Sequence, residues 1–110
     1  MDATRSPITP RRVALHYWCM ATWMATFVLL CSGGIVTSKG VGMSVPDWPT
    51  TYGYNMFAYP ASTWMFGPFD LLVEHSHRLL GTVAGLISIG LVVAAWRFEA
   101  RGWFKWWTVW

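Results

Sequence analysis

Two long apolar segments constrain this chain more than any other feature of its sequence. The first covers residues 13–36 and the second covers residues 71–96, which carry no charged side chain from Leu79 to Trp96. A helix of about 20 apolar residues crosses a bilayer, so each segment is long enough to span it. Lipid offers no partners to backbone N–H and C=O groups, so both spans must be helical. The predicted fold is an all-α membrane protein with two transmembrane helices.

Composition supports this class. Hydrophobic residues make up 55% of the 110 residues and charged residues only 12%, about half the charged share that is usual in soluble domains. A cleaved signal peptide is the alternative for the first segment. That segment is longer than a signal-peptide core usually is, and no small-x-small cleavage site precedes its glycines. We therefore expect a retained helix.

The basic residues predict how the chain is oriented. Three precede the first span and three follow the second, whereas the intervening loop has only Lys39; the six are Arg5, Arg11, Arg12, Arg97, Arg101 and Lys105. By the positive-inside rule, residues 1–12 form a cytoplasmic tail and residues 97–110 lie in the cytoplasm too. This last segment is either an interfacial Trp-rich end or the start of a third span. The net charge of +3 is thus a topology signal and does not indicate nucleic-acid binding.

The outer loop, residues 37–70, is rich in Gly, Pro and aromatic residues. Such a loop is expected to lie on a surface, either the membrane interface or a pocket that it covers. Within PDWP, Pro46 and Pro49 restrict the backbone, and Asp47 is expected to close an Asx-turn. The motif is compatible with a structural turn and with a direct chemical role, and both interpretations stay open here.

One face of the second helix carries the ionisable side chains. At about 100° per residue, Glu74, His77 and Arg78 fall on a stripe that continues through the small residues Gly81, Ala84, Gly85 and Ser88. His75 points away from His77 by about 200°, so the two histidines do not serve one site. The pair Gly81 and Gly85 allows either another helix or a flat ligand to approach closely.

Ionisable groups in a membrane span are costly and usually face a cavity or a partner. Glu74 can pair with Arg78 one turn later, which leaves His77 as a metal ligand. Haem iron needs only one or two protein ligands, whereas zinc needs three or four, so haem is the favoured metal group. The alternative is an interfacial charge cluster with a snorkelling Arg78. His16 is about 20 Å away along the helices and cannot ligate the same iron within one protomer.

Two motifs, GGIVTSKGVGMSVPDWPTTYG and then LVEHSHRLLGTVAGL, resemble the N-terminal portion of the heme A synthase family, across roughly Val13 to Trp96. The resemblance implies the first part of an eight-helix bundle of two similar halves, which oxidises the methyl group of heme O to the formyl group of heme A. It also implies that the family's E-x-x-H-R motif corresponds to Glu74, His77 and Arg78. In the family, this histidine is an axial haem ligand and this glutamate is needed for activity. The loop motif, Gly42–Gly53, is expected to cover the site.

The sequence departs from the family in two respects. One branch has a cysteine pair in the loop where this chain has Val45 and Thr51, so a mechanism that uses the pair is absent. The family's other haem histidines lie on later helices, and the chain has none of them. We therefore expect a fragment or truncated form, or a chain that assembles with others.

The leading hypothesis is a haem A synthase-like oxidoreductase of cytochrome oxidase assembly, in the bacterial inner membrane. His77 would hold the iron of b-type haem or of the haem O substrate, with Glu74 handling protons or steering the substrate. Arg78 would pair with Glu74 or a haem propionate, and Gly81 and Gly85 would leave room for the macrocycle. Expected partners are haem, the lipid bilayer, and the remaining helices or other copies of the chain. The alternatives are a non-enzymatic two-span b-type haem protein that oligomerises and an inert truncated hairpin.

Overall fold

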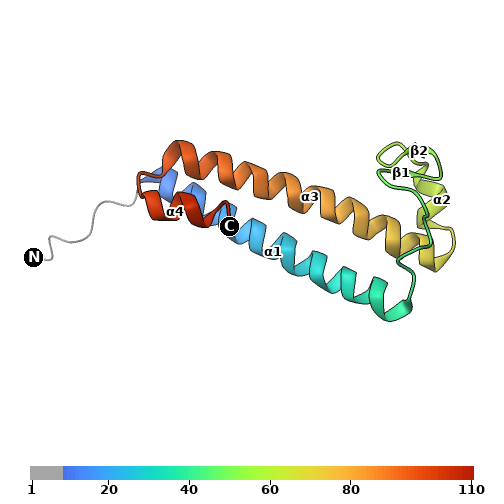
Figure 1. The fold of residues 1–110 in the computed structure, drawn as a ribbon. Coiled ribbons are helices and arrows are strands. Elements are labelled where there is room, and N and C mark those ends of the chain that lie inside the picture. Colours follow the sequence, from blue (N-terminus) through green and yellow to red (C-terminus); the bar gives the residue numbers. More distant parts are fainter. Residues whose placement is uncertain (1–8) are drawn as a thin grey trace, which may run out of the picture. The chain divides into compact units, whose positions relative to one another are not determined.

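The computed structural model describes residues 9–110 and is mainly helical (Figure 1). Its elements in chain order are α1 (Pro10–Lys39), β1 (Thr50–Thr51), β2 (Tyr54–Asn55), α2 (Ala61–Met65), α3 (Phe69–Phe98) and α4 (Gly102–Trp107). The prediction of a mainly helical chain with two long apolar helices is confirmed. Arg5 and most of the predicted tail, residues 1–12, lie outside the described residues.

The helices α1 and α3 have 30 residues each and extend beyond the predicted segments by two or three residues at either end. A helix of this length is about 45 Å long, so its ends pass beyond a hydrocarbon core of about 30 Å. Both helices are long and apolar enough to cross a membrane, and of the side chains of α1 only Leu15 is buried. Apolar surface on this scale requires lipid or other helices to cover it. Together with the similarity reported below, it indicates an integral membrane protein.

The chain forms two compact units. One consists of Met1–Met24 with Gly85–Trp110, and the other is Ala25–Ala84. Each long helix contributes one part to each unit. The loop that joins α1 to α3 belongs wholly to the second unit, which also holds Glu74, His77 and Arg78.

In the first unit, α1 packs against α3 through Trp18. The indole Nε1–H of Trp18 donates a 2.8 Å hydrogen bond to the backbone carbonyl of Ile87. The ring also occupies the space beside Gly90, where a Cβ atom would lie only 2.5 Å from the Cζ2 atom of Trp18. Gly90 is therefore required by this contact, because any side chain there would displace the indole.

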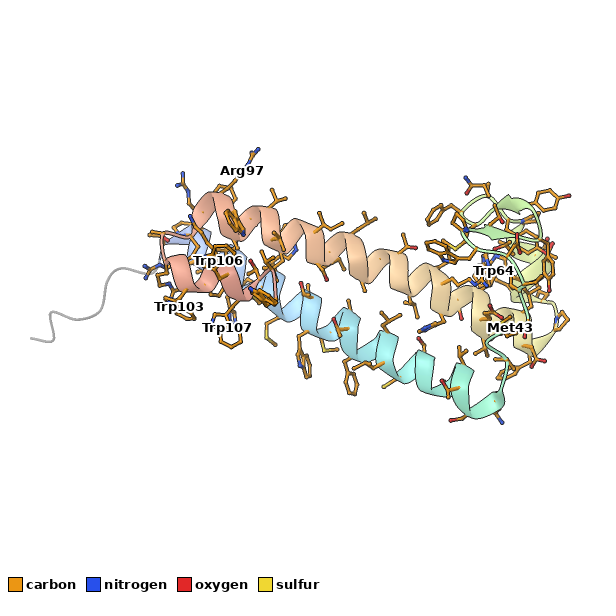
Figure 2. The ribbon with its side chains drawn as sticks, viewed as in Figure 1. Met43, Trp64, Arg97, Trp103, Trp106 and Trp107 are labelled. Carbon is orange, nitrogen blue, oxygen red and sulfur yellow. The ribbon has the colours of Figure 1, made fainter. Side chains whose placement is uncertain are left out.

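The chain turns after α3 around Glu99, whose carboxylate accepts hydrogen bonds from the backbone N–H groups of Ala100 and Arg101 and from the guanidinium of Arg101. The Arg101 side chain is the main reason that the pKa of Glu99 is lowered to about 2. The six-residue helix α4 follows and bears Trp103, Trp106 and Trp107, which are labelled in Figure 2. At six residues it is too short to cross a bilayer by itself.

The loop of the second unit is folded. Its strands β1 and β2 form a small antiparallel hairpin in which Thr50 pairs with Asn55 and Thr51 with Tyr54. The two turn residues, Tyr52 and Gly53, have φ angles of 49° and 78°. Positive φ at both positions is typical of the tight turn whose twist matches the strands, and it explains a glycine at the second position.

Gly90→Ala should destabilise the first unit by about 1–3 kcal/mol, because the added methyl group overlaps the Trp18 ring. Thermal unfolding in detergent, followed by circular dichroism, should show a lower Tm. Gly34→Ala is the matched control, since a Cβ atom at Gly34 meets nothing within 4 Å. Equal Tm values for the two variants would contradict this account of the packing.

Candidate functional site

The first three turns of α3 carry Asp70 and four further ionisable side chains, and these four face three different neighbours. Glu74 and Arg78 face the segment after α1, His75 faces the hairpin and α2, and His77 faces α1. Glu74 and Arg78 share a face because they are four positions apart. His77 was predicted on the same stripe as Glu74, but it contacts α1 and not the loop.

Glu74 and Arg78 form a salt bridge of 2.6 Å one helical turn apart, which is the pairing that the sequence predicts. Glu74 is buried, with an exposed fraction of 4%. Its other carboxylate oxygen accepts a hydrogen bond of 2.9 Å from the backbone N–H of Val45. Both oxygens of Glu74 are therefore engaged, one by its own helix and one by the loop.

Arg78 anchors the loop to α3. Its two terminal nitrogens donate to the backbone carbonyls of Val45, Asp47 and Thr50, in addition to the carboxylate of Glu74. The planar guanidinium suits this task because its donors are held in one fixed fork. We use the name loop clamp for Glu74 and Arg78 together with the backbone of residues 45–50, to which their side chains are hydrogen-bonded. The carbonyl contacts could not be read from the sequence, since backbone acceptors leave no trace in residue types.

Asp47 organises the hairpin within this loop. Its carboxylate accepts hydrogen bonds of 2.8 Å from the backbone N–H groups of Tyr52 and Gly53, and one from the hydroxyl of Thr50. The predicted Asx-turn was wrong, because the N–H group that it needs belongs to the residue two positions on, and this is Pro49. The pKa of Asp47 is lowered to about 2, mainly by the hydrogen bond from Gly53 and next by the hydrogen bond from Thr50.

His77 contacts the C-terminal part of α1. Its Nδ1 atom lies 2.6 Å from the hydroxyl oxygen of Ser32. The ring also lies beside Gly33, where a Cβ atom would come within 3.1 Å of Cε1. No hydrogen bond reaches Nε2 from residues 9–110. Neither Ser32 nor Gly33 was predicted from the sequence as a neighbour of His77, although a Ser-Gly-Gly run inside an apolar span was an available signal.

His75 is buried, with an exposed fraction of 1%. Its Nδ1 atom is 3.3 Å from the hydroxyl of Thr51, and its ring lies 5.6 Å from Tyr59 and 4.9 Å from Trp64 between centroids. Trp64 is labelled in Figure 2. The Nε2 atom of His75 has no hydrogen-bond partner in the described part of the chain. His75 thus packs the hairpin and α2 onto α3, and its different neighbours agree with the predicted separation from His77.

Neither glycine of the small-residue stripe is required by packing within residues 9–110. A Cβ atom at Gly81 would lie 3.8 Å from Leu29, an ordinary contact, and one at Gly85 would meet nothing within 4 Å. No group of three or more His, Cys, Asp or Glu side chains in this range is placed to hold a metal ion.

The amino-acid sequence of the chain is similar to those of several known heme A synthases. The chain is 31% identical over 85 residues to the heme A synthase of Geobacillus kaustophilus, a match that covers 76% of this chain and 25% of that protein. With the heme A synthase of Staphylococcus aureus strain JH9 the identity is 34% over 79 residues, or 71% of this chain and 23% of the relative. For Alkalihalophilus pseudofirmus the values are 26% over 84 residues, with 76% and 26% covered. The resemblance to the N-terminal portion of the heme A synthase family is confirmed.

The chain spans about a quarter of the length of these heme A synthases. No protein-family model matches the chain. No solved structure matches it either.

The loop clamp joins the two motifs that carry the resemblance to heme A synthases. Arg78 and Glu74 belong to the E-x-x-H-R motif, and the backbone that they bind belongs to the PDWP loop. The two positions at which one family branch has cysteines, Val45 and Thr51, are both buried here. Val45 offers its N–H and its carbonyl to the clamp, and Thr51 lies against His75.

Arg78→Lys should release the loop, because an ammonium keeps the charge but cannot reproduce the fork that binds three carbonyls. Each lost hydrogen bond to a charged group is worth about 1.5–3 kcal/mol, so exchange of the Val45, Tyr52 and Gly53 amides should accelerate at least about tenfold. Hydrogen exchange read by mass spectrometry or NMR measures this. Arg97→Lys, on the same helix, is the control; unchanged exchange in Arg78→Lys would rule out the clamp.

Asp47 should make the hairpin sensitive to acid. Because its pKa is lower in the folded loop than its ordinary 3.8, the stability that it contributes is complete above 3.8 and is lost as the pH falls through about 2. Amide chemical shifts of Tyr52 and Gly53, followed from neutral pH downwards, should change with a midpoint near 2. Asp47→Asn should abolish the transition, and a wild-type midpoint near 3.8 would refute the assignment.

Proposed function

We propose that the chain forms the first two transmembrane helices of a haem A synthase-like oxidoreductase, which converts haem O to haem A for cytochrome oxidase assembly. The observation that carries this proposal is the position of His77 in the E-x-x-H-R motif. One ring nitrogen of His77 is held by Ser32, and the other has no hydrogen-bond partner among the described residues. An imidazole in this state is suited to donate an electron pair to haem iron.

The residues present fit a haem group on three counts. The donor is an imidazole, which is a common axial ligand of haem iron. The stripe that continues from it has Gly81, which no packing contact within residues 9–110 requires to be a glycine. The folded aromatic loop is clamped to the same turns of α3 and would shield that region from water. When bound, the haem would supply the oxidative chemistry, and the chain would supply orientation and a dry pocket.

The loop clamp changes the roles expected for Glu74 and Arg78. Both carboxylate oxygens of Glu74 already accept hydrogen bonds, and both terminal nitrogens of Arg78 are donors to the loop or to Glu74. We propose that the pair acts first by holding the loop. Proton handling by Glu74, or a contact between Arg78 and a haem propionate, would require one of these bonds to open.

We propose that the second ligand and the rest of the bundle come from outside these residues, because no group of three or more His, Cys, Asp or Glu side chains within residues 9–110 is placed to hold a metal ion. In the leading proposal they belong to later helices of an eight-helix bundle in the bacterial inner membrane. In the alternative, copies of the chain associate and clamp one b-type haem without enzymatic activity. Both share the orientation proposed from the basic residues, with cytoplasmic termini and an outer loop.

Haem spectra of the purified chain and the haem content of cells separate these proposals. Conversion of haem O to haem A in cells that express the protein supports the enzyme, and its loss in His77→Ala ties the activity to this ligand. A low-spin bis-histidine spectrum from the chain alone, lost in His77→Ala, would favour the oligomeric haem protein. His16→Ala is the control and should bind haem as the wild type does. Absence of haem under every condition would refute both.

A further inference from the structure

We propose that Ser32 and Gly33 of α1 are positioning residues that fix the tautomer and the location of the His77 ring. This inference rests on the proposed function, in which His77 binds haem iron. The tautomer of His77 and the position of its ring are nevertheless properties of the chain without haem. Both residues contact His77 within the unit Ala25–Ala84.

The hydrogen bonds of Ser32 determine which nitrogen of His77 carries the proton. The Ser32 hydroxyl oxygen lies 2.9 Å from the backbone carbonyl of Leu29 and 2.6 Å from Nδ1 of His77. A hydroxyl has one hydrogen to donate, and a carbonyl can only accept. The hydroxyl therefore donates to Leu29, and Nδ1–H of His77 donates to the hydroxyl. The opposite arrangement would place two oxygen acceptors 2.9 Å apart with no proton between them.

The consequence is a lone pair on Nε2. A neutral imidazole has one N–H, so a proton held on Nδ1 leaves Nε2 as the electron-pair donor. Metal-binding histidines generally donate their other N–H to a protein acceptor, which sets both the tautomer and the orientation of the ring. Ser32 supplies that acceptor here, before any metal is bound.

Gly33 determines where the ring can lie. A Cβ atom at this position would be 3.1 Å from Cε1, 3.6 Å from Nε2 and 3.9 Å from Nδ1 of His77. Cε1 joins the two ring nitrogens, so a methyl group would press on the edge that carries both of them. The ring would have to move away from α1, which would lengthen the bond to Ser32 and redirect Nε2. A Cβ atom added at Gly34, the next residue, would meet nothing within 4 Å.

An ordinary intrahelical serine does not account for this arrangement. Ser76 shows the ordinary case, in which the hydroxyl donates to the carbonyl of Val73, three residues earlier, at 3.0 Å and makes no second side-chain hydrogen bond within residues 9–110. Ser32 makes the same bond and also accepts from His77, 45 positions along the chain. Ser76 is therefore a matched control for the added interaction.

The tautomer is tested on the protein without haem. In protein with ¹⁵N-labelled histidine, at a pH where the imidazole is neutral, the His77 nitrogen shifts should show a protonated Nδ1. Ser32→Ala should shift the population toward protonated Nε2, Ser32→Thr should preserve the native form, and Ser76→Ala should leave it unchanged. A wild-type ring protonated on Nε2 would overturn the proposal.

The effect on iron binding is tested with ferric haem b, titrated by its Soret absorbance. Ser32→Ala and Gly33→Ala should weaken binding by about 10–100-fold, the usual cost of losing an interaction that orients a metal ligand. Ser76→Ala and Gly34→Ala should bind as the wild type does, with equal helicity by circular dichroism in all variants. Equal effects in Gly33→Ala and Gly34→Ala would refute the role of Gly33. If the tautomer is as proposed but haem does not bind, the proposed function fails while this inference stands.

Discussion

The ion pair of the buried Glu74 and the half-buried Arg78 is the interaction on which the organisation of the loop depends. Burying two charges is costly, and their mutual attraction seldom compensates unless further hydrogen bonds satisfy the remaining donors and acceptors. Here the backbone of the loop supplies them, with one N–H for Glu74 and three carbonyls for Arg78. The pair and the loop are thus mutually dependent, because each satisfies polar groups that the other would leave buried and unpaired.

The clamp also explains how the irregular part of this loop acquires a defined fold. Residues 45–50 have no regular secondary structure for most of their length, so their backbone groups need other partners. Arg78 satisfies carbonyls from the side of α3, and Asp47 satisfies the N–H groups of the hairpin from within the loop. His75, Tyr59 and Trp64 add an aromatic contact beneath the hairpin. One turn and a half of α3 therefore anchors the loop by charge and by packing.

His77 takes no part in holding the loop, because its angle on the helix turns it toward α1. It faces α1, where a serine and a glycine form its surroundings, while its helix neighbours hold the loop. A ligand that shares no hydrogen bond with the clamp can be oriented independently of it. In the proposed function, Glu74, His75 and Arg78 would shape the region and His77 would meet the metal group.

The sequence by itself determined the class of fold and the pairing of Glu74 with Arg78 on one face of α3. Apolar length identifies spans because lipid cannot satisfy a backbone, and helical spacing pairs Glu74 with Arg78 because four residues make one turn. The motifs were sufficient to indicate the family. Only the tertiary structure showed the contacts of Arg78 with three loop carbonyls, the bonds of Asp47 to Tyr52 and Gly53 instead of an Asx-turn, and the contact of Ser32 and Gly33 with His77. These depend on backbone atoms and on residues far apart in the chain, and neither residue type nor local spacing records which distant groups come within hydrogen-bond distance.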